Sequence, residues 1–226
     1  MPYTVQVEFR TASSFLVAYS VNLSRGGLFI ETEADVPAGA QMTIDFTVPG
    51  AGTTSLNGVV AWRRGIEEIG NGPPGIGIEF QDVAPQLGST IDKLVTGFHG
   101  VQILLLSGDR QDRVTLARNI KSIISTAEIT QAADAQVAES VLTGEIDVAL
   151  VDLDFDLDGG LATIRAAKQQ TPPVPAIALT SNAANRDRAI EAGADELLAN
   201  PPPFAELQVT LVRALGKPIT VKTLTS

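Results

Sequence analysis

The chain has 226 residues, 44% hydrophobic and 19% charged, a composition typical of folded protein and a length that allows two domains of ordinary size. The absence of cysteine excludes disulfides, thiolate nucleophiles and zinc ribbons, and a single histidine, His99, argues against a histidine-rich metal site or a Ser-His-Asp triad. Up to Gly100 there are 5 Lys and Arg against 10 Asp and Glu, and after it 11 against 16, so both halves are acidic. This charge argues against broad binding to nucleic acid or to anionic membranes. No apolar run approaches ~20 residues and the start lacks a signal-peptide pattern, so we expect a cytoplasmic protein.

Residues 4–80 contain short apolar stretches with an alternating pattern, separated by clusters of Gly, Pro, Asn and Ser. Six stretches are expected to be strands: 4–10, 14–22, 27–32, 41–49, 55–62 and 75–80. A short helix should follow, since Ile91, Leu94, Val95 and Phe98 recur at helical spacing. The pattern predicts a small six-stranded all-β barrel or sandwich, with a domain boundary at residues 97–100.

The second half alternates strands and helices. Residues 101–106, 148–153 and 174–180 are nearly continuous apolar runs, as expected for parallel strands buried on both faces. Weaker strands are expected at 128–131 and 196–199, with amphipathic helices between the strands and a closing helix at 204–215. Five βα units predict a doubly wound α/β domain over residues 101–217, followed by a tail at 218–226. Ligands of such a sheet lie beyond the carboxyl ends of its strands.

Asn22 ends the second expected strand, Gly27 begins the third, and Ser24 and Arg25 lie between the two. Asn and Ser can bond the neighbouring backbone, and glycines permit close approach of a ligand, so both a tight hairpin and a ligand loop are compatible with the pattern. With the order of the strands, this segment resembles the PilZ family over roughly residues 4–98. It is closest to the subgroup whose second strand reads YxxNxSRGGLF, which runs from Tyr19 to Phe29 here. The resemblance implies a PilZ-like domain at 1–98 and cyclic di-GMP as the family's ligand.

The family binds cyclic di-GMP with two motifs, and only one of them is present. The D/N-x-S-x-x-G motif is intact as Asn22, Ser24 and Gly27, but residues 1–4 hold no R-x-x-x-R segment, and Arg10 has Ser14 four residues later. Arg25 could contact an anion, but a single guanidinium does not replace the two arginines of the missing R-x-x-x-R segment. Each lost charge-assisted contact is worth ~1.5–3 kcal/mol, so the nucleotide site is interpreted as degenerate. The alternative is a cyclic di-GMP-responsive effector that borrows an arginine from elsewhere.

In the second half, Asp152 ends the central strand, Thr180 and Ser181 end the next strand, and Asn200 precedes Pro201. This pattern resembles the receiver domain of bacterial response regulators over residues 101–217. The resemblance implies that Asp152 holds the phosphoacceptor position, and that Thr180 and residue 200 hold the positions that couple the phosphate to a surface switch.

The receiver chemistry also requires groups that this sequence lacks. In the family, Mg²⁺ is held by two acids after the first strand, where this chain has Ser107 and Gly108, with Asp109 one place late. The lysine position is Asn200. We therefore predict a pseudo-receiver without a metal or cofactor. A phosphorylatable response regulator that uses Asp152 with an unusual metal site is the alternative.

A run of alternating aspartates begins at Asp152 and continues with Asp154, Asp156 and Asp158 before Gly159. Counted from Asp154 it matches the opening of a calcium-binding loop. Position 12 then falls on Arg165 rather than a bidentate glutamate. An acidic rim around the site is the alternative that we favour.

These interpretations predict a non-enzymatic bacterial signalling adaptor that acts through protein–protein contacts. By resemblance, its partners would be signalling proteins that dock on a face made by helix 183–193, strand 196–199 and helix 204–215. The family association suggests motility or polarity control.

Overall fold

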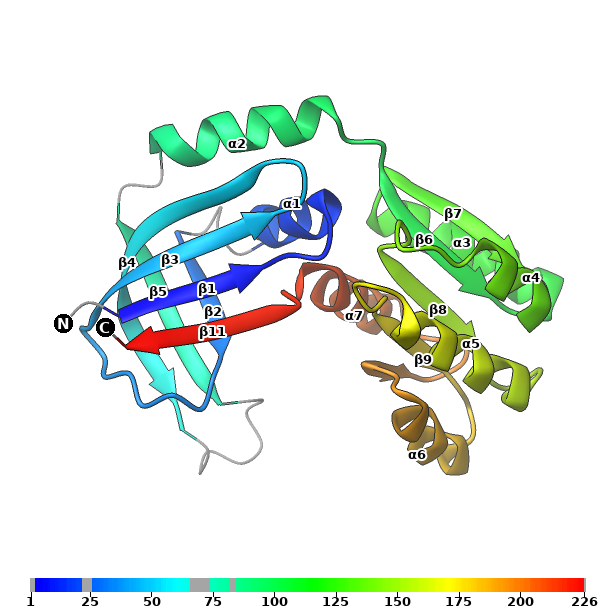
Figure 1. Cartoon of the computed structure of the whole chain (residues 1–226). Coiled ribbons are helices and arrows are strands. Elements are labelled where there is room, and N and C mark those ends of the chain that lie inside the picture. Colours follow the sequence, from blue (N-terminus) through cyan, green and yellow to red (C-terminus); the bar gives the residue numbers. More distant parts are fainter. Residues whose placement is uncertain (1–2, 22–25, 66–73, 82–83, 226) are drawn as a thin grey trace. The chain divides into compact units, whose positions relative to one another are not determined.

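The computed structural model describes residues 3–21, 26–65, 74–81 and 84–225. The chain divides into two compact units, a first unit of residues 1–98 with 216–226 and a second unit of residues 99–215. The chain therefore leaves the first unit and returns to it at its C-terminal end, where the red strand lies beside the blue N-terminal strand in Figure 1. Within the described residues, no helix is both long enough and apolar enough to cross a membrane.

The first unit contains a six-stranded sheet in the order β11-β1-β3-β4-β5-β2. Its strands are β1 (Tyr3–Glu8), β2 (Gly27–Glu31), β3 (Gln41–Val48), β4 (Gly52–Arg64), β5 (Gly75–Gln81) and β11 (Thr220–Thr225). Strand β1 is parallel to β3, and the other neighbouring pairs are antiparallel.

The C-terminal residues are not the tail that the sequence suggested. Strand β11 pairs with β1 over its whole length, from Tyr3 opposite Thr225 to Glu8 opposite Thr220. The segment is rich in β-branched residues, which favour strands, and β1 would otherwise present an open edge. The interpretation of residues 218–226 as a tail is therefore corrected, since they form an edge strand of the first unit.

The second expected strand, residues 14–22, is also corrected, because most of it belongs to helix α1 (Ala12–Val21). The helix begins with reciprocal hydrogen bonds: Ser14 N–H donates to Thr11 Oγ1 (3.1 Å) and Thr11 N–H donates to Ser14 Oγ (3.2 Å). This is a capping-box arrangement, which satisfies backbone donors at the helix start. Phe15 then packs against Phe9 and Phe46, with ring centroids 5.3 and 6.3 Å away. The cap and this aromatic core favour a helix although the apolar pattern also fits a strand.

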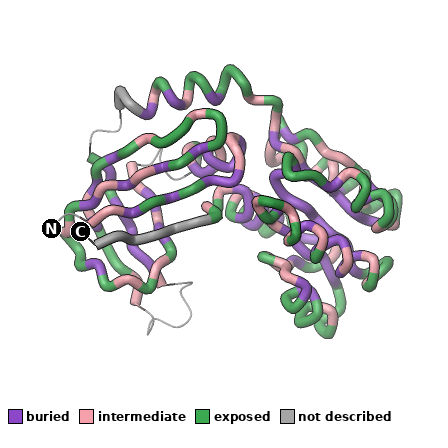
Figure 2. Tube along the Cα trace, viewed as in Figure 1, coloured by how far each residue is buried: buried purple, intermediate pink, exposed green. Residues whose placement is uncertain are grey.

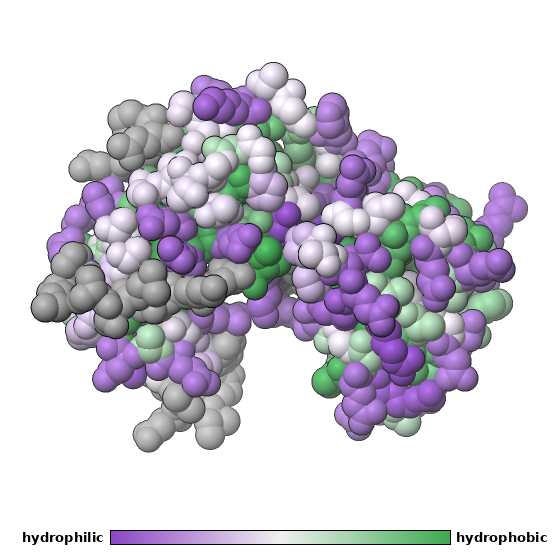
Figure 3. All heavy atoms as spheres, viewed as in Figure 1, coloured by the Kyte–Doolittle hydropathy of each residue, from purple (hydrophilic) through white to green (hydrophobic). Residues whose placement is uncertain are grey.

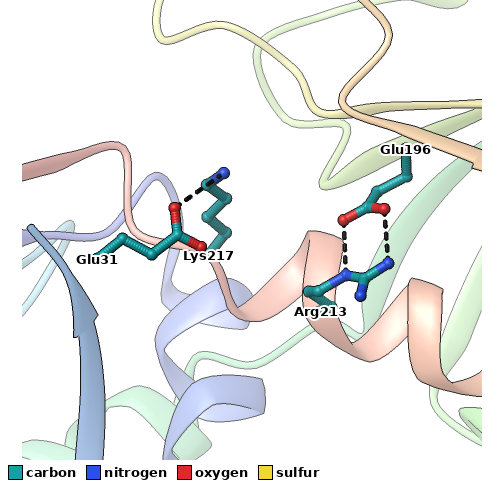
Figure 4. A network of polar contacts seen from close by, with 4 residues as sticks. All are labelled: Glu31, Glu196, Arg213 and Lys217. Carbon is teal, nitrogen blue, oxygen red and sulfur yellow. Dashed lines mark hydrogen bonds and ion pairs between the residues drawn. The ribbon is translucent and has the colours of Figure 1, made fainter. Parts of the chain in front are cut away.

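The core of the first unit lies between the sheet and its helices α1 and α2 (Ala84–Thr96), with Val7, Ile44 and Leu87 among its buried members. The sheet order ends at β11 and β2, and among the described residues no strand pairing joins these edges into the expected closed barrel. An ion pair of 3.6 Å between Lys217 and Glu31 ties the segment before β11 to the end of β2 (Figure 4).

The second unit is a five-stranded parallel sheet in the order β10-β9-β8-β6-β7, connected by helices. Its strands are β6 (Val101–Leu106), β7 (Ala127–Ala132), β8 (Val148–Asp152), β9 (Ala176–Leu179) and β10 (Glu196–Leu198). Its helices are α3 (Arg110–Ile123), α4 (Ala135–Val141), α5 (Leu157–Gln169), α6 (Ala183–Ala192) and α7 (Phe204–Gly216). Strands β8 and β9 are buried at every residue, as Figure 2 shows, because helices flank the parallel strands. This strand order is flavodoxin-like. From β6 the chain adds β7 on one side of the sheet and then β8, β9 and β10 on the other side, which confirms the expected doubly wound domain.

Candidate functional site

A hollow of about 290 Å³ lies at the carboxyl ends of the parallel strands of the second unit. Ser107 follows β6, Asp152 ends β8, Thr180 follows β9 and Asn200 follows β10, so residues distant in the sequence meet at one edge of the sheet. The residues that line the hollow are Asp109, Asp112, Asp152, Asp154, Phe155, Asn200 and Pro201. The structure therefore brings together the three positions that the sequence analysis singled out in this domain.

The carboxylate of Asp152 is buried and already carries three hydrogen bonds from the chain. Ser107 Oγ donates to its Oδ2 (2.9 Å), while Asp154 N–H and Asn200 Nδ2 both donate to its Oδ1 (2.9 Å each). Burial raises the pKa of Asp152, the hydrogen bonds from Asp154 and Ser107 lower it, and the charges of Asp154 and Asp112 raise it, with a net increase. The charge thus lies among neutral donors and other carboxylates.

Asp154 accepts hydrogen bonds from the two neighbouring loops. Thr180 Oγ1 donates to its Oδ1 (2.7 Å), and Ser181 N–H (2.8 Å) and Asn200 Nδ2 (3.4 Å) donate to its Oδ2. Burial raises the pKa of Asp154, but the hydrogen bonds from Thr180, Ser181 and Asn200 outweigh it and hold the pKa below its usual range. Asp154 is therefore a stable anion at neutral pH.

The other acids near the site have separate local roles. Asp109 is the N-cap of α3 and accepts from the backbone N–H groups of Gln111 and Asp112. Asp156 is the N-cap of α5, and Asp158 pairs with Arg188 at 3.0 Å. Helix caps and an exposed pair explain the alternating aspartates without calcium. Among the described residues, no three acidic or histidine side chains lie close enough to hold a metal ion.

The loop after β6 differs from a Mg²⁺ site in shape as well as in chemistry. The exposed ring of Phe155 lies over Gly108, and a Cβ added at Gly108 would come within 2.0 Å of it. Mg²⁺ prefers several hard oxygen ligands at octahedral geometry, whereas here Asp152 accepts from Ser107 and Asn200 and Asp109 caps a helix. The residues present do not fit a Mg²⁺ ion at this place.

Three comparisons with known proteins bear on this architecture. Residues 1–97 match the family model described as PilZ domain. Among solved structures, the receiver domain of a sensor histidine kinase from Pseudomonas aeruginosa, titled as having magnesium coordinated in its active-site cleft, is 30% identical, with a TM-score of 0.46, and covers 52% of this chain and 99% of its own. The receiver domain of a DNA-binding response regulator from Colwellia psychrerythraea is 23% identical over the same shares, with a TM-score of 0.47. No curated protein matches the chain.

The first 97 residues form a PilZ domain. With the flavodoxin-like sheet of the second unit, the chain has a PilZ plus receiver-like architecture, as the sequence predicted.

Of the PilZ motif residues, Asn22, Ser24 and Arg25 lie outside the described residues. Gly27 begins strand β2, opposite Glu79 of β5, and a Cβ at this position would lie 2.6 Å from the carbonyl oxygen of Ile78. The close approach of two strands therefore requires a glycine here, independently of any ligand.

The role of Asp154 was not apparent from the sequence, in which this residue was interpreted as part of an acidic rim or as a calcium ligand. Two features could have identified it. Asp154 follows Asp152 by two residues, so its backbone N–H can bond the Asp152 carboxylate in a turn. The next strand ends in adjacent hydroxyl residues, Thr180 and Ser181, at the same sheet edge.

Proposed function

We propose that this chain is a non-enzymatic cytoplasmic signalling adaptor whose receiver-like domain is a pseudo-receiver and acts through protein–protein contacts. PilZ and receiver domains are signalling modules, and the PilZ match supports a role of this kind. The proposal includes motility or polarity control, and the only basis for this part is the family resemblance.

The observation that carries the proposal is the state of Asp152. Its carboxylate is occupied by Ser107, the Asp154 N–H and Asn200, all of them neutral donors. A phosphoryl group arriving there would meet the negative charges of Asp154, Asp109 and Asp112, and the lining of the hollow includes no lysine or arginine among the described residues. Repulsion between unit charges at such short range costs several kcal/mol near a protein surface (about 4 at 4 Å), so phosphorylation without a cation is strongly disfavoured.

The proposed docking face is formed by α6, β10 and α7. Arg213 of α7 binds Glu196 of β10 with two hydrogen bonds of 2.6 Å, which fixes the helix against the edge strand (Figure 4). Ile190 of α6 and Val209 of α7 are exposed apolar side chains, 56% and 62% accessible. Figure 3 shows hydrophilic and apolar residues interspersed on one face of the molecule.

The proposal is tested by treating the full chain with acetyl phosphate and Mg²⁺ and measuring its intact mass. We expect no phosphoryl adduct, because the metal lacks ligands and Asp152 is already occupied. Beryllofluoride with Mg²⁺ should likewise leave the amide spectrum unchanged. An adduct that disappears in Asp152→Ala would overturn the proposal and favour the phosphorylatable regulator.

A cyclic di-GMP-responsive effector is the second candidate, favoured by the match of residues 1–97 to the PilZ model and by the intact Asn22, Ser24 and Gly27 motif. Calorimetry with cyclic di-GMP, repeated on Ser24→Ala, separates this candidate from a ligand-independent adaptor.

A further inference from the structure

Donors from two loops converge on the carboxylate of Asp154. They are the Thr180 hydroxyl, the Ser181 backbone N–H and the Asn200 amide, at 2.7, 2.8 and 3.4 Å. Three donors of different kinds directed at one pair of oxygens form the arrangement by which proteins bind small oxyanions. In this chain the anion is supplied by the loop after β8.

We propose that Thr180, Ser181 and Asn200 form an oxyanion site and that Asp154 occupies it as an internal ligand. The site would accept a carboxylate or a group of similar size and charge. It is filled in the native chain, so an external anion has access only when the Asp154 carboxylate is removed.

The presence of Asp154 in this site holds the ends of β9 and β10 and the start of α6 in place. Thr180 also donates its backbone N–H to the carbonyl of Leu198 in β10 (3.0 Å), and its hydroxyl oxygen accepts from Asn182 N–H (3.1 Å) at the start of α6. Asn200 lies between β10 and α7 and bonds both Asp152 and Asp154. With Asp154 in place, the ends of β9 and β10 are therefore held in one arrangement without any external signal. The inference goes beyond the proposed function and does not depend on it.

Hydrogen exchange of the full chain tests the proposal at the Ser181 amide. In Asp154→Ala this amide loses a bond to a charged acceptor, and we expect its exchange to become roughly 10- to 100-fold faster. Sodium acetate, which returns the missing carboxylate as a free ion, should restore slow exchange, whereas sodium chloride at equal ionic strength should not. The restoration by acetate should be absent in Asp154→Ala combined with Thr180→Val, which lacks the hydroxyl donor.

Asp158→Ala is the matched control, because Asp158 lies close to Asp154 in the sequence, in the first turn of α5, but pairs with Arg188 at the surface. Its Ser181 exchange should equal that of the native chain. If Asp154→Ala fails to fold, Asp154→Asn keeps the shape and loses one acceptor oxygen, and it should speed exchange at Ser181 or Asn182.

Unchanged exchange at these amides, or fast exchange that acetate and chloride affect equally, would overturn the oxyanion site. A phosphoryl adduct on the native chain would overturn the pseudo-receiver and leave this result standing, so the two failures are distinguishable.

Discussion

Two aspartates separated by one residue have opposite electrostatic environments at the carboxyl end of β8. Burial dominates at Asp152 and raises its pKa, whereas hydrogen bonds from Thr180, Ser181 and Asn200 dominate at Asp154 and lower its pKa. The charged form of Asp154 therefore stabilises the fold, whereas the charged form of Asp152 destabilises it.

This difference predicts that Asp152→Asn stabilises the second unit at neutral pH. A folded-state pKa above the unfolded value of about 3.9 means that the folded chain binds this proton more tightly. The cost of the charge is then fully present above the folded pKa and disappears as the pH falls through it. Thermal unfolding followed by calorimetry should show a higher Tm for Asp152→Asn at pH 7, with a gap that narrows toward pH ~4.

The matched control is Asp158→Asn, where the carboxylate is at the surface and paired with Arg188. Neutralising it should leave Tm nearly unchanged, since exposed pairs contribute about 0–1 kcal/mol. A lower Tm for Asp152→Asn at pH 7 would mean that the hydrogen bonds to the charged form outweigh its burial.

At the scale of elements, strand β4 depends on a glycine in its interior. Gly58 is buried between β3 and β5, and a Cβ there would lie 2.6 Å from Cγ2 of Ile78 and 2.8 Å from the carbonyl oxygen of Glu79. The backbone oxygen cannot move away without breaking the strand pairing, so the strain must persist.

We therefore predict that Gly58→Ala lowers the unfolding free energy by roughly 1–3 kcal/mol, as overpacking of a core does. Gly88→Ala is the matched control, because nothing lies within 4 Å of its added Cβ and alanine favours a helix such as α2. The only tryptophan of the chain, Trp62, lies in β4, so its fluorescence during urea unfolding reports on the first unit. Equal midpoints for the two variants would contradict the predicted clash.

At the scale of the whole molecule, the first unit is completed by the last residues of the chain. Strand β11 covers the edge of β1 through six paired positions, although more than a hundred residues of the second unit separate it from α2. The second unit is therefore attached to the first at both of its ends. Helix α7 is followed, after the three residues 217–219, by strand β11 of the PilZ sheet.

Deleting residues 217–226 should destabilise the first unit. At roughly 1 kcal/mol for each ladder hydrogen bond, the loss of a six-residue strand costs several kcal/mol, and the exposed edge of β1 favours self-association. Urea unfolding followed by Trp62 fluorescence and sedimentation measure the two effects. Lys217→Ala removes only the exposed pair with Glu31 and should cost less than about 1 kcal/mol. An unchanged midpoint after the deletion would show that β11 adds little to the sheet.

The sequence by itself determined the two-domain plan and most of the elements. Continuous apolar runs identified β6, β8 and β9, because parallel strands buried on both faces leave no room for polar residues. The alternation of apolar and polar residues in β3 and β4 similarly indicated a sheet with one buried face. The placing of Asp152, Thr180 and Asn200 at one edge followed from the rule that parallel strands end together.

Tertiary structure decided what local pattern left open. Residues 14–22 fit both a strand and a helix, and the Thr11–Ser14 cap with the packing of Phe15 against Phe9 selected the helix. The residues of β11 form a strand only because they pair with the edge of β1. Strand β1 lies at the other end of the sequence, so the local sequence around β11 could not predict this pairing. The role of Asp154 likewise depends on donors that arrive from Thr180 and Asn200, so only the assembled sheet edge could assign it.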